Sequence, residues 1–323
     1  MARLVLFFCF LISMNAAVDT DFNGRWNLKV TNEPRTRVWW LEVDDAGKPS
    51  IHGTFVGAPG GDVDKIPKIR IEKGQLVWQF EKHYGGAAGN QVGIYRATIE
   101  DGKLVGSLHV NGLDSASREF VGTRAPDIAD KEDGTWKRGK PIELFNGKDL
   151  AGWHAMVPGK DLGWEVKDRL LSNVAGANNL VSDQKFWNFE LHVTFRLGKD
   201  SNSGLGLRGR YEVQILEDFG KPADIHGMGA LYGRKAPSKN AGVAPGEWQT
   251  MDVRLVGRTV TIVVNDSRVI ERYDIPGLTA IANDANEDQP GSIAIQGDHG
   301  AIEFRKISIT PLTQTGAPRG GAR

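Results

Sequence analysis

The stretch VRLVGRTVTIVVNDSRVIERY, residues 253–273, indicates an antiparallel β fold. Apolar and polar residues alternate on both sides of Asn265 and Asp266, a pair typical of tight hairpin turns. We therefore expect a β-hairpin that turns at these two residues. The same alternation recurs from residue 142 onward, in segments such as FELHVTFRL, SGLGLRGRYEVQIL, GSIAIQGDH and AIEFRKISITPL. A short helix is expected only near residues 278–285.

Two β-rich regions flank a charged segment. Residues 20–125 contain short alternating runs separated by DDAGK, EKG and EDGK, which predict a small antiparallel barrel; FNGRWNL places Gly24 and Trp26 at its entrance, as in lipocalin-like barrels. Residues 126–140 have no periodicity and are interpreted as a linker. The longer strands of residues 141–312 predict a two-sheet jelly-roll sandwich, so the whole chain is expected to be all-β. Residues 313–323 are expected to form a disordered tail.

The N-terminus predicts export from the cell. Residues 1–17, MARLVLFFCFLISMNAA, combine one basic residue, a short apolar run and small residues, as in a secretory signal peptide; a retained N-terminal anchor is the alternative. Cys9, the only cysteine, lies in this segment, so the mature chain is expected to contain no disulfide and no thiolate metal site. We expect a periplasmic or secreted bacterial protein with no membrane span once the signal is removed.

Composition and motifs exclude several function classes. The 40 Lys and Arg residues balance the 40 Asp and Glu residues, which argues against nucleic acid or an anionic membrane as a partner. The sequence contains no phosphate-binding Walker loop and no dinucleotide fingerprint, so no nucleotide cofactor is expected. It also lacks the G-x-S-x-G and H-E-x-x-H patterns of serine hydrolases and zinc proteases.

The stretch GRYEVQILED, residues 209–218, places polar residues inside an apolar strand. Strand alternation predicts one polar face and one apolar face. A solvated outer face would give this pattern too, but glycine-rich loops on both sides are more typical of a cleft floor. The expected polar face comprises Arg208, Arg210, Glu212 and Gln214, and the flanking loops carry Asn202, His226 and Tyr232.

The spacing Glu212-x-Gln214-x-x-Glu217 resembles the Glu-x-Asp-x-x-Glu of certain sandwich glycosidases, in which the two glutamates are nucleophile and proton donor. Here Gln214 replaces the middle acid, which weakens that interpretation. In a regular strand Glu217 would point away from Glu212, unless a β-bulge brings it back. His299, beside Asp298, is a candidate base or metal ligand, although a lone exposed histidine is the alternative.

Five stretches together resemble the 3-keto-disaccharide hydrolase domain: IELFNGKDLAGWHA, NSGLGLRGRYEVQILEDFG, GALYG, PGEWQTMDVRLVGRTVTIVVND and IAIQGDHGAIEFRKISITPL. The resemblance covers about residues 141–312 and implies a concanavalin A-like jelly-roll sandwich. It also implies cleavage of glycosides already oxidised at C3 of the sugar. GLGLRGR departs from the usual family pattern, because a leucine stands where an aromatic residue is frequent.

The resemblance implies C2 deprotonation, β-elimination of the C1 substituent and addition of water, with a carbohydrate as the partner. Glu212 or His299 is the candidate base, and Glu217 is a further catalytic candidate. Arg208 and Gln214 would steady the enolate or the sugar hydroxyls. One divalent metal ion held by Glu217 and His226 would polarise the ketone. The remaining substrate-binding candidates are Arg210, Asn202, Asn240 and Tyr232.

Two other functions stay open at this point. The same fold hosts lectins, so the domain could be a carbohydrate-binding module without catalysis. A structural role in surface adhesion is the third interpretation. Substitution of Glu212 and Glu217 separates these functions, because an enzyme would lose turnover whereas a lectin would keep most of its binding.

Overall fold

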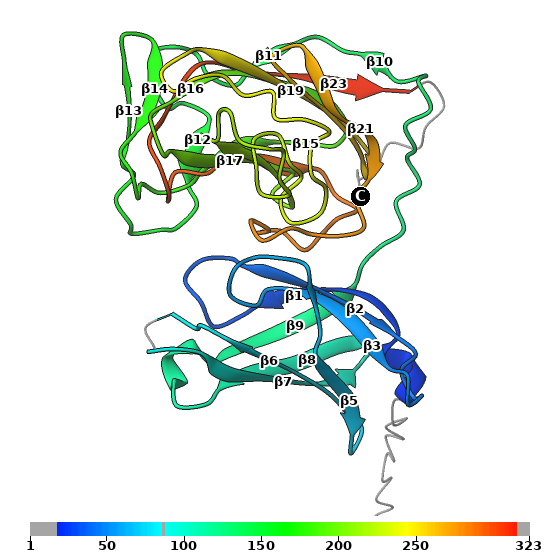
Figure 1. Cartoon of the computed structure of the whole chain (residues 1–323). Coiled ribbons are helices and arrows are strands. Elements are labelled where there is room, and N and C mark those ends of the chain that lie inside the picture. Colours follow the sequence, from blue (N-terminus) through cyan, green and yellow to red (C-terminus); the bar gives the residue numbers. More distant parts are fainter. Residues whose placement is uncertain (1–17, 86–87, 315–323) are drawn as a thin grey trace, which may run out of the picture.

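The computed structural model describes residues 18–85 and 88–314 and is almost entirely β-structure, in two stacked domains (Figure 1). The predicted signal peptide and residues 315–323 of the predicted tail lie outside these residues. No helix in the described ranges is long and apolar enough to cross a membrane.

The first domain is one curled antiparallel sheet with the strand order β4-β3-β2-β1-β9-β8-β7-β6-β5. Its strands are β1 (Gly24–Val30), β2 (Val38–Asp44), β3 (His52–Val56), β4 (Asp64–Lys65), β5 (Lys68–Glu72), β6 (Gln75–Lys82), β7 (Gln91–Glu100), β8 (Lys103–Val110) and β9 (Arg118–Arg124). Short 3-10 helices, η1 (Asp19–Phe22) and η2 (Asp114–Ala116), precede β1 and β9. The pairing is antiparallel throughout, as expected for this region, and β1 lies between β2 and β9. The likeness to a lipocalin barrel stays a prediction.

Aromatic side chains fill the inside of this curled sheet. Tyr95 stacks on Trp78 with ring centroids 5.0 Å apart and meets Phe55 edge-on, also at 5.0 Å. Trp26 is buried at one end, where its Nε1 donates to the carbonyl oxygen of Phe22 at 3.0 Å and the Arg124 guanidinium lies 3.8 Å from the ring centroid. Aromatic packing thus stabilises this small domain.

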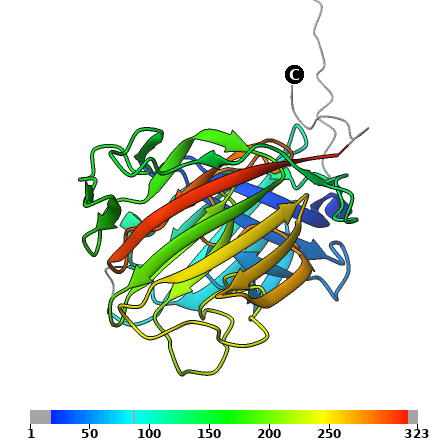
Figure 2. The same ribbon diagram turned by 90° about the horizontal axis from the view of Figure 1, so that it is seen from above.

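The second domain is a sandwich of two antiparallel sheets, as predicted. The larger sheet has the order β13-β14-β23-β16-β19-β20-β21, with β10 and β11 also paired to β23, and the smaller has the order β12-β15-β22-β17-β18 (Figure 2). The strands are β10 (Lys137–Arg138), β11 (Ile142–Glu143), β12 (Trp153–Ala155), β13 (Trp164–Lys167), β14 (Leu170–Asn173), β15 (Leu180–Phe186), β16 (Phe189–Leu197), β17 (Asn202–Leu207), β18 (Tyr211–Leu216), β19 (Gln249–Val256), β20 (Thr259–Val264), β21 (Ser267–Asp274), β22 (Gly291–Ile295) and β23 (Ile302–Thr313). Apolar residues from both sheets, such as Val193 and Val213, form one buried core.

The predicted hairpin is part of a three-stranded meander. Asn265 and Asp266 both have positive φ, 47° and 62°, as a two-residue hairpin turn requires. A second turn at Gly257 (φ 54°) joins β19 to β20. The expected helix near residues 278–285 is wrong: its backbone pairs instead with the turn before β18, since the Thr279 and Asn283 amides donate to the carbonyl oxygens of Arg210 and Gly209 at 3.1 and 2.9 Å.

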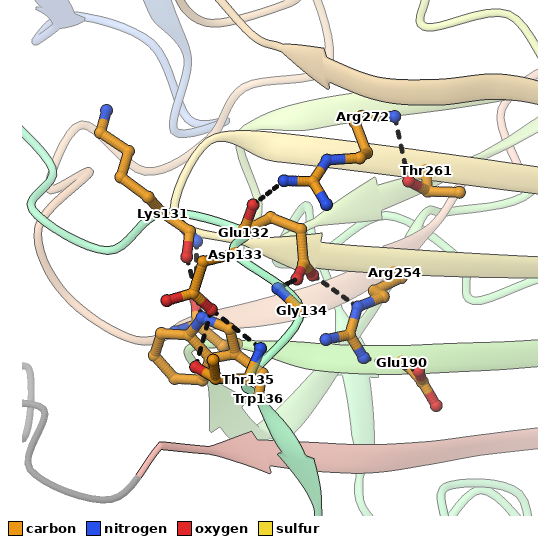
Figure 3. Close-up of polar contacts among 12 residues, drawn as sticks. Lys131, Glu132, Asp133, Gly134, Thr135, Trp136, Glu190, Arg254, Thr261 and Arg272 are labelled. Atoms are coloured by element: carbon orange, nitrogen blue, oxygen red, sulfur yellow. Dashed lines mark hydrogen bonds and ion pairs between the residues drawn. The ribbon is translucent and has the colours of Figure 1, made fainter.

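The segment interpreted as a linker is packed against the sandwich (Figure 3). The Glu132 carboxylate accepts from Arg254 Nε at 2.6 Å, and the indole Nε1 of Trp136 donates to the carbonyl oxygen of Lys131 at 2.9 Å. Lys137 and Arg138 then add a short strand to β23. Much of residues 126–140 is therefore held in place, although it has no hydrophobic period.

The two domains share a buried interface. Trp40 and Val56 of the first domain belong to the same buried cluster as the sandwich core. The Val38 amide donates to the carbonyl oxygen of Ala282 at 2.9 Å, and Asn27 Nδ2 donates to Glu287 Oε2 at 2.8 Å. The first domain thus packs, through buried contacts, against the loop between β21 and β22, and its own loops reach the candidate site.

Candidate functional site

The floor of the site is the outer face of the small sheet, where β17 and β18 pair. Glu212 and Gln214 lie opposite Gly206 and Gly204 in the register of these strands. A Cβ atom at Gly204 would lie 2.9 Å from Glu212 Oε1, so any larger residue there would displace the carboxylate. Glycines opposite two long polar side chains therefore hollow the sheet at this point.

A cavity of about 190 Å³ lies over this floor and extends to the first domain. It brings together half of the residues expected from the sequence: Asn202, Glu212, Gln214, Tyr232 and His299. Its other lining residues are Arg35 and Gly60 of the first domain and Ala280, Ile281, Gln296 and Asp298 of the second. The site is thus built from both domains.

Glu212 is the carboxylate at the bottom of this cavity and is only 3% exposed. Burial raises its pKa to about 7; nearby His299 and Arg35 oppose the shift, and Asp298 reinforces it. Its amide donates to Thr279 Oγ1 at 2.8 Å, whereas its carboxylate makes no hydrogen bond or ion pair with the described residues. A carboxylate that titrates near neutral pH and has no structural partner is suited to general base catalysis.

His299, Asp298 and Arg35 form a chain of charges on the cavity wall. His299 Nδ1 lies 3.0 Å from Asp298 Oδ1, and this hydrogen bond raises the pKa of His299. Arg35 Nη1 lies 3.5 Å from Asp298 Oδ2. Burial alone would raise the pKa of Asp298, but its partners His299 and Arg35 keep that pKa below its ordinary value. Asp298 therefore orients His299 through Nδ1, which leaves Nε2 for a ligand.

Two amide side chains supply unused hydrogen-bonding capacity. Gln214 Nε2 donates to Asn202 Oδ1 at 3.2 Å. The buried Oε1 atoms of Gln214 and Gln296 have no partner within the described part of the chain, although both residues line the cavity. Because a buried acceptor without a donor costs free energy, these oxygens are suited to the hydroxyl groups of a bound sugar.

Arg208 and Arg210, expected on the same face as Glu212, are not part of the cavity. Positive φ values at Arg208 and Gly209, 55° and 66°, make residues 208–210 a turn, so β18 begins only at Tyr211. Arg208 donates to the carbonyl oxygen of Gly257 and lies 4.4 Å from the Trp187 ring centroid. Arg210 bonds Asp284 Oδ2 at 2.7 Å. Both guanidinium groups therefore stabilise the fold.

Three further candidates also lie outside the cavity. Glu217 Oε2 accepts from the Asp200 amide at 3.0 Å, beyond the end of β18. His226 Nε2 lies 2.5 Å from Asp62 Oδ1. Asn240 Nδ2 donates to the carbonyl oxygen of Asp218 at 2.8 Å. Glu217 and His226 thus have separate partners, and no cluster of three or more His, Cys, Asp or Glu residues occurs in ranges 18–85 and 88–314. The donor set does not fit the expected metal.

Sequence reasoning missed Arg35 and undervalued Gln296 and Asp298. The last two precede the predicted His299 in IQGDHG, so their position next to a candidate base was a usable signal. Arg35 lies in NEPRTR, between β1 and β2 of the first domain, and nothing in that segment indicates a contact with the second domain.

Residues 140–310 match the family described as the 3-keto-alpha-glucoside-1,2-lyase-like domain. The chain belongs to this family. This confirms the family resemblance found in the sequence and shows a member of a carbohydrate-active family.

Solved structures similar to this chain include two proteins of Parabacteroides distasonis ATCC 8503, each provisionally described as a glycosyl hydrolase. One has 27% identity and a TM-score of 0.47 and covers 58% of this chain and 92% of its own. The other has 26% identity and a TM-score of 0.44 and covers 54% and 100%. A non-specific endo-beta-1,3(4)-glucanase, SCLam, has 10% identity and a TM-score of 0.37 and covers 58% and 95%. No curated protein sequence matches the chain.

Proposed function

We propose that the protein cleaves glycosides whose sugar carries a ketone at C3, by elimination followed by addition of water. The observation that carries this proposal is the state of Glu212, a buried carboxylate without a structural partner and with a pKa of about 7. Ordinary glycosidases need two carboxyl groups facing the scissile bond. Here Gln214 replaces the middle acid and Glu217 lies outside the cavity. Asp298, the other carboxylate that lines the cavity, is paired with His299 and Arg35.

The reaction needs one base at C2. The C3 ketone acidifies the C2–H bond, and the Glu212 carboxylate accepts that proton while the electron pair delocalises onto the C3 oxygen. The electrons then form a C1=C2 double bond as the C1–O bond breaks, and the leaving oxygen takes up a proton. Water adds at C1 and a proton returns to C2, so the net result is hydrolysis. A base with a pKa of about 7 is well matched to this step near neutral pH.

Positive groups on the cavity wall support the enolate. His299, whose pKa is raised by Asp298, and Arg35 both line the cavity that contains Glu212. Their charge would stabilise the negative oxygen that develops at C3 or at the leaving group. Arg35 thus takes the role that sequence reasoning gave to Arg208. Asn202, Gln214 and Gln296 would hold the sugar hydroxyls.

The decisive experiment compares a 3-keto-glucoside that bears a chromogenic leaving group with its unoxidised glucoside, in D₂O as well as in water. We expect release from the keto substrate alone, with deuterium incorporated at C2 of the product. The rate should rise with pH through about 7, because Glu212 must be ionised to accept the proton. Equal release from the unoxidised glucoside would overturn the proposal in favour of ordinary hydrolysis. Saturable sugar binding without release would favour a carbohydrate-binding module.

The same assay tests the expected divalent metal. Since Glu217 and His226 have separate partners, our scheme has no step that depends on them. A rate that falls after treatment with a chelator and recovers with added metal would show that a metal site exists elsewhere in the complex with substrate.

A further inference from the structure

A second, larger cavity adjoins the first at the end of the curled sheet. It has a volume of about 450 Å³ and is lined mainly by the first domain. Gly60 and Ala280 line both cavities. The two cavities are therefore neighbours that share a partition, and one lies over Glu212 while the other lies against the first domain.

The residues that line both cavities, Gly60 and Ala280, are small. Gly60 and Gly61 have φ values of 104° and 74°, a backbone conformation that favours glycine. A Cβ atom at Gly61 would lie 2.8 Å from the Cβ atom of Ala280, so the two domains approach closely here. Of the two residues common to both linings, only Ala280 carries a side-chain atom, its methyl group, so a larger residue at this position would separate the cavities further.

The wall of the second cavity carries groups that bind hydroxyls. Glu33 is paired with Arg37 at 2.9 Å and with Arg118, and the Glu33 side chain is only 9% exposed. Arg37 uses Nε for this pair, which leaves its terminal nitrogens available as donors. The Trp39 Nε1 atom is buried and has no partner among the described residues, although Trp39 lines the cavity. Arginine, carboxylate and indole N–H groups together offer both donors and acceptors.

The volumes of the two cavities suggest that each holds a different part of the substrate. Ligand pockets for small molecules usually enclose roughly 300–1,000 Å³. The cavity over Glu212, at about 190 Å³, is smaller than this range, whereas the adjoining one, at about 450 Å³, falls within it. The first has room for the reacting ring, and a second ring would have to lie in its neighbour.

We propose that the second cavity is the leaving-group subsite and that it takes a hydroxylated leaving group, a second sugar ring, with Arg37 as a specificity-determining residue. This inference rests on the function proposed above. It gives the first domain a part in substrate choice, because the loops that carry Arg37 and Gly60 form one wall of the complete site.

The test uses the full chain and two substrates, a 3-keto-disaccharide and methyl 3-keto-glucoside, whose leaving group is too small to reach Arg37. We expect Arg37→Ala to lower kcat/KM for the disaccharide by about tenfold to a hundredfold and to leave the methyl substrate within about twofold. Arg70→Ala is the matched control, because Arg70 is an exposed arginine of β5 that pairs with Glu72 and lines neither cavity. This control should change neither rate.

Ala280 provides a second, steric test. Ala280→Leu should narrow the passage and lower kcat/KM for the disaccharide much more than for the methyl substrate, whereas Ala280→Gly should not discriminate between them. Circular dichroism and the melting temperature would verify that each variant is folded.

If Arg37→Ala lowers kcat/KM equally for both substrates, or for neither, the proposed leaving-group subsite is wrong, whereas the proposed elimination chemistry is unaffected. If the unmodified protein releases product from neither keto substrate, the proposed function itself fails.

Discussion

Residues 208–210 and 212–214 have the same polar alternation and are about equally buried, yet the first segment forms a structural turn and the second lines the candidate site. Arg208 and Arg210 are 0% exposed, and Glu212 and Gln214 are 3% and 2% exposed. Arg210 has an aspartate and a carbonyl oxygen as partners, at 2.7 Å each. The Gln214 Oε1 atom has no hydrogen-bond partner in the described chain, and Glu212 and Gln214 both line a cavity. Neither burial nor unmet bonding capacity alone marks a functional residue, because Arg208 Nε and Nη1 are also buried without a partner among the described residues. Glu212 and Gln214 differ from Arg208 in lining the cavity that both domains form.

The difference arises from the backbone. The two-residue period of a strand holds only while φ remains extended, and positive φ at Arg208 and Gly209 interrupts it. The period that places Glu212 and Gln214 on one face starts anew at Tyr211. Substitutions before and after Tyr211 therefore distinguish a structural turn from a functional strand.

The largest expected effect is on turnover by Glu212→Gln. This variant keeps the shape of the side chain but cannot accept the C2 proton, so kcat should fall by about 10²- to 10⁴-fold. The measurement is release of a chromogenic group from a 3-keto-glucoside. If substrate binding is retained while turnover is lost, Glu212 acts in the chemical step. A rate within threefold of the original would instead make His299 the base.

The same variant should be more stable than the original protein at alkaline pH. The pKa of Glu212 is about 7 in the fold against an ordinary 4.5, so the folded state binds more protons than the unfolded state between these values. Stability therefore falls as pH rises from 4.5 to 7, by at most about 3 kcal/mol. Glu212→Gln should recover this free energy of unfolding at pH 8 but not at pH 4, as measured by urea denaturation.

An equal difference in stability at both pH values would contradict this prediction, because it would show that Glu212 titrates at an ordinary pKa. A loss of stability from Glu212 that is confined to neutral and alkaline pH would instead show that the fold holds the ionised carboxylate in an unfavourable environment. Such strain is expected of a functional residue rather than of a structural one.

A smaller effect is expected from a substitution in the turn at residues 208–210. Arg210→Met removes the bonds to Asp284 and to the Gln289 carbonyl oxygen, and should lower the free energy of unfolding by about 2 kcal/mol. Because Arg210 does not line the cavity, kcat/KM of the folded fraction should change little. A stable variant that has lost its activity would return Arg210 to the substrate site, where sequence reasoning placed it.

Local patterns predicted the part of the site that lies within one strand and its neighbouring loops. Alternation identified the sheets and placed Glu212 with Gln214, and the GDHG segment pointed to His299. Arg35 could not be found in this way, because its contact with Asp298 depends on how two domains pack. The helix expected near residues 278–285 failed for a related reason: its backbone groups are satisfied by a distant turn.

The smallest effect is expected from Glu217→Gln. This variant tests whether the functional part of the strand ends before Glu217. The Glu217 carboxylate accepts the Asp200 amide at 3.0 Å outside the cavity, and a glutamine carbonyl can accept the same bond. We expect kcat/KM to stay within about threefold and stability to change by less than about 1 kcal/mol. The measurement is kcat/KM on the 3-keto substrate, beside Glu212→Gln as the inactive reference.

A loss comparable to that of Glu212→Gln would mean that substrate draws Glu217 into the site. A pair of carboxylates would then share the chemistry, and the single-base scheme would have to be abandoned.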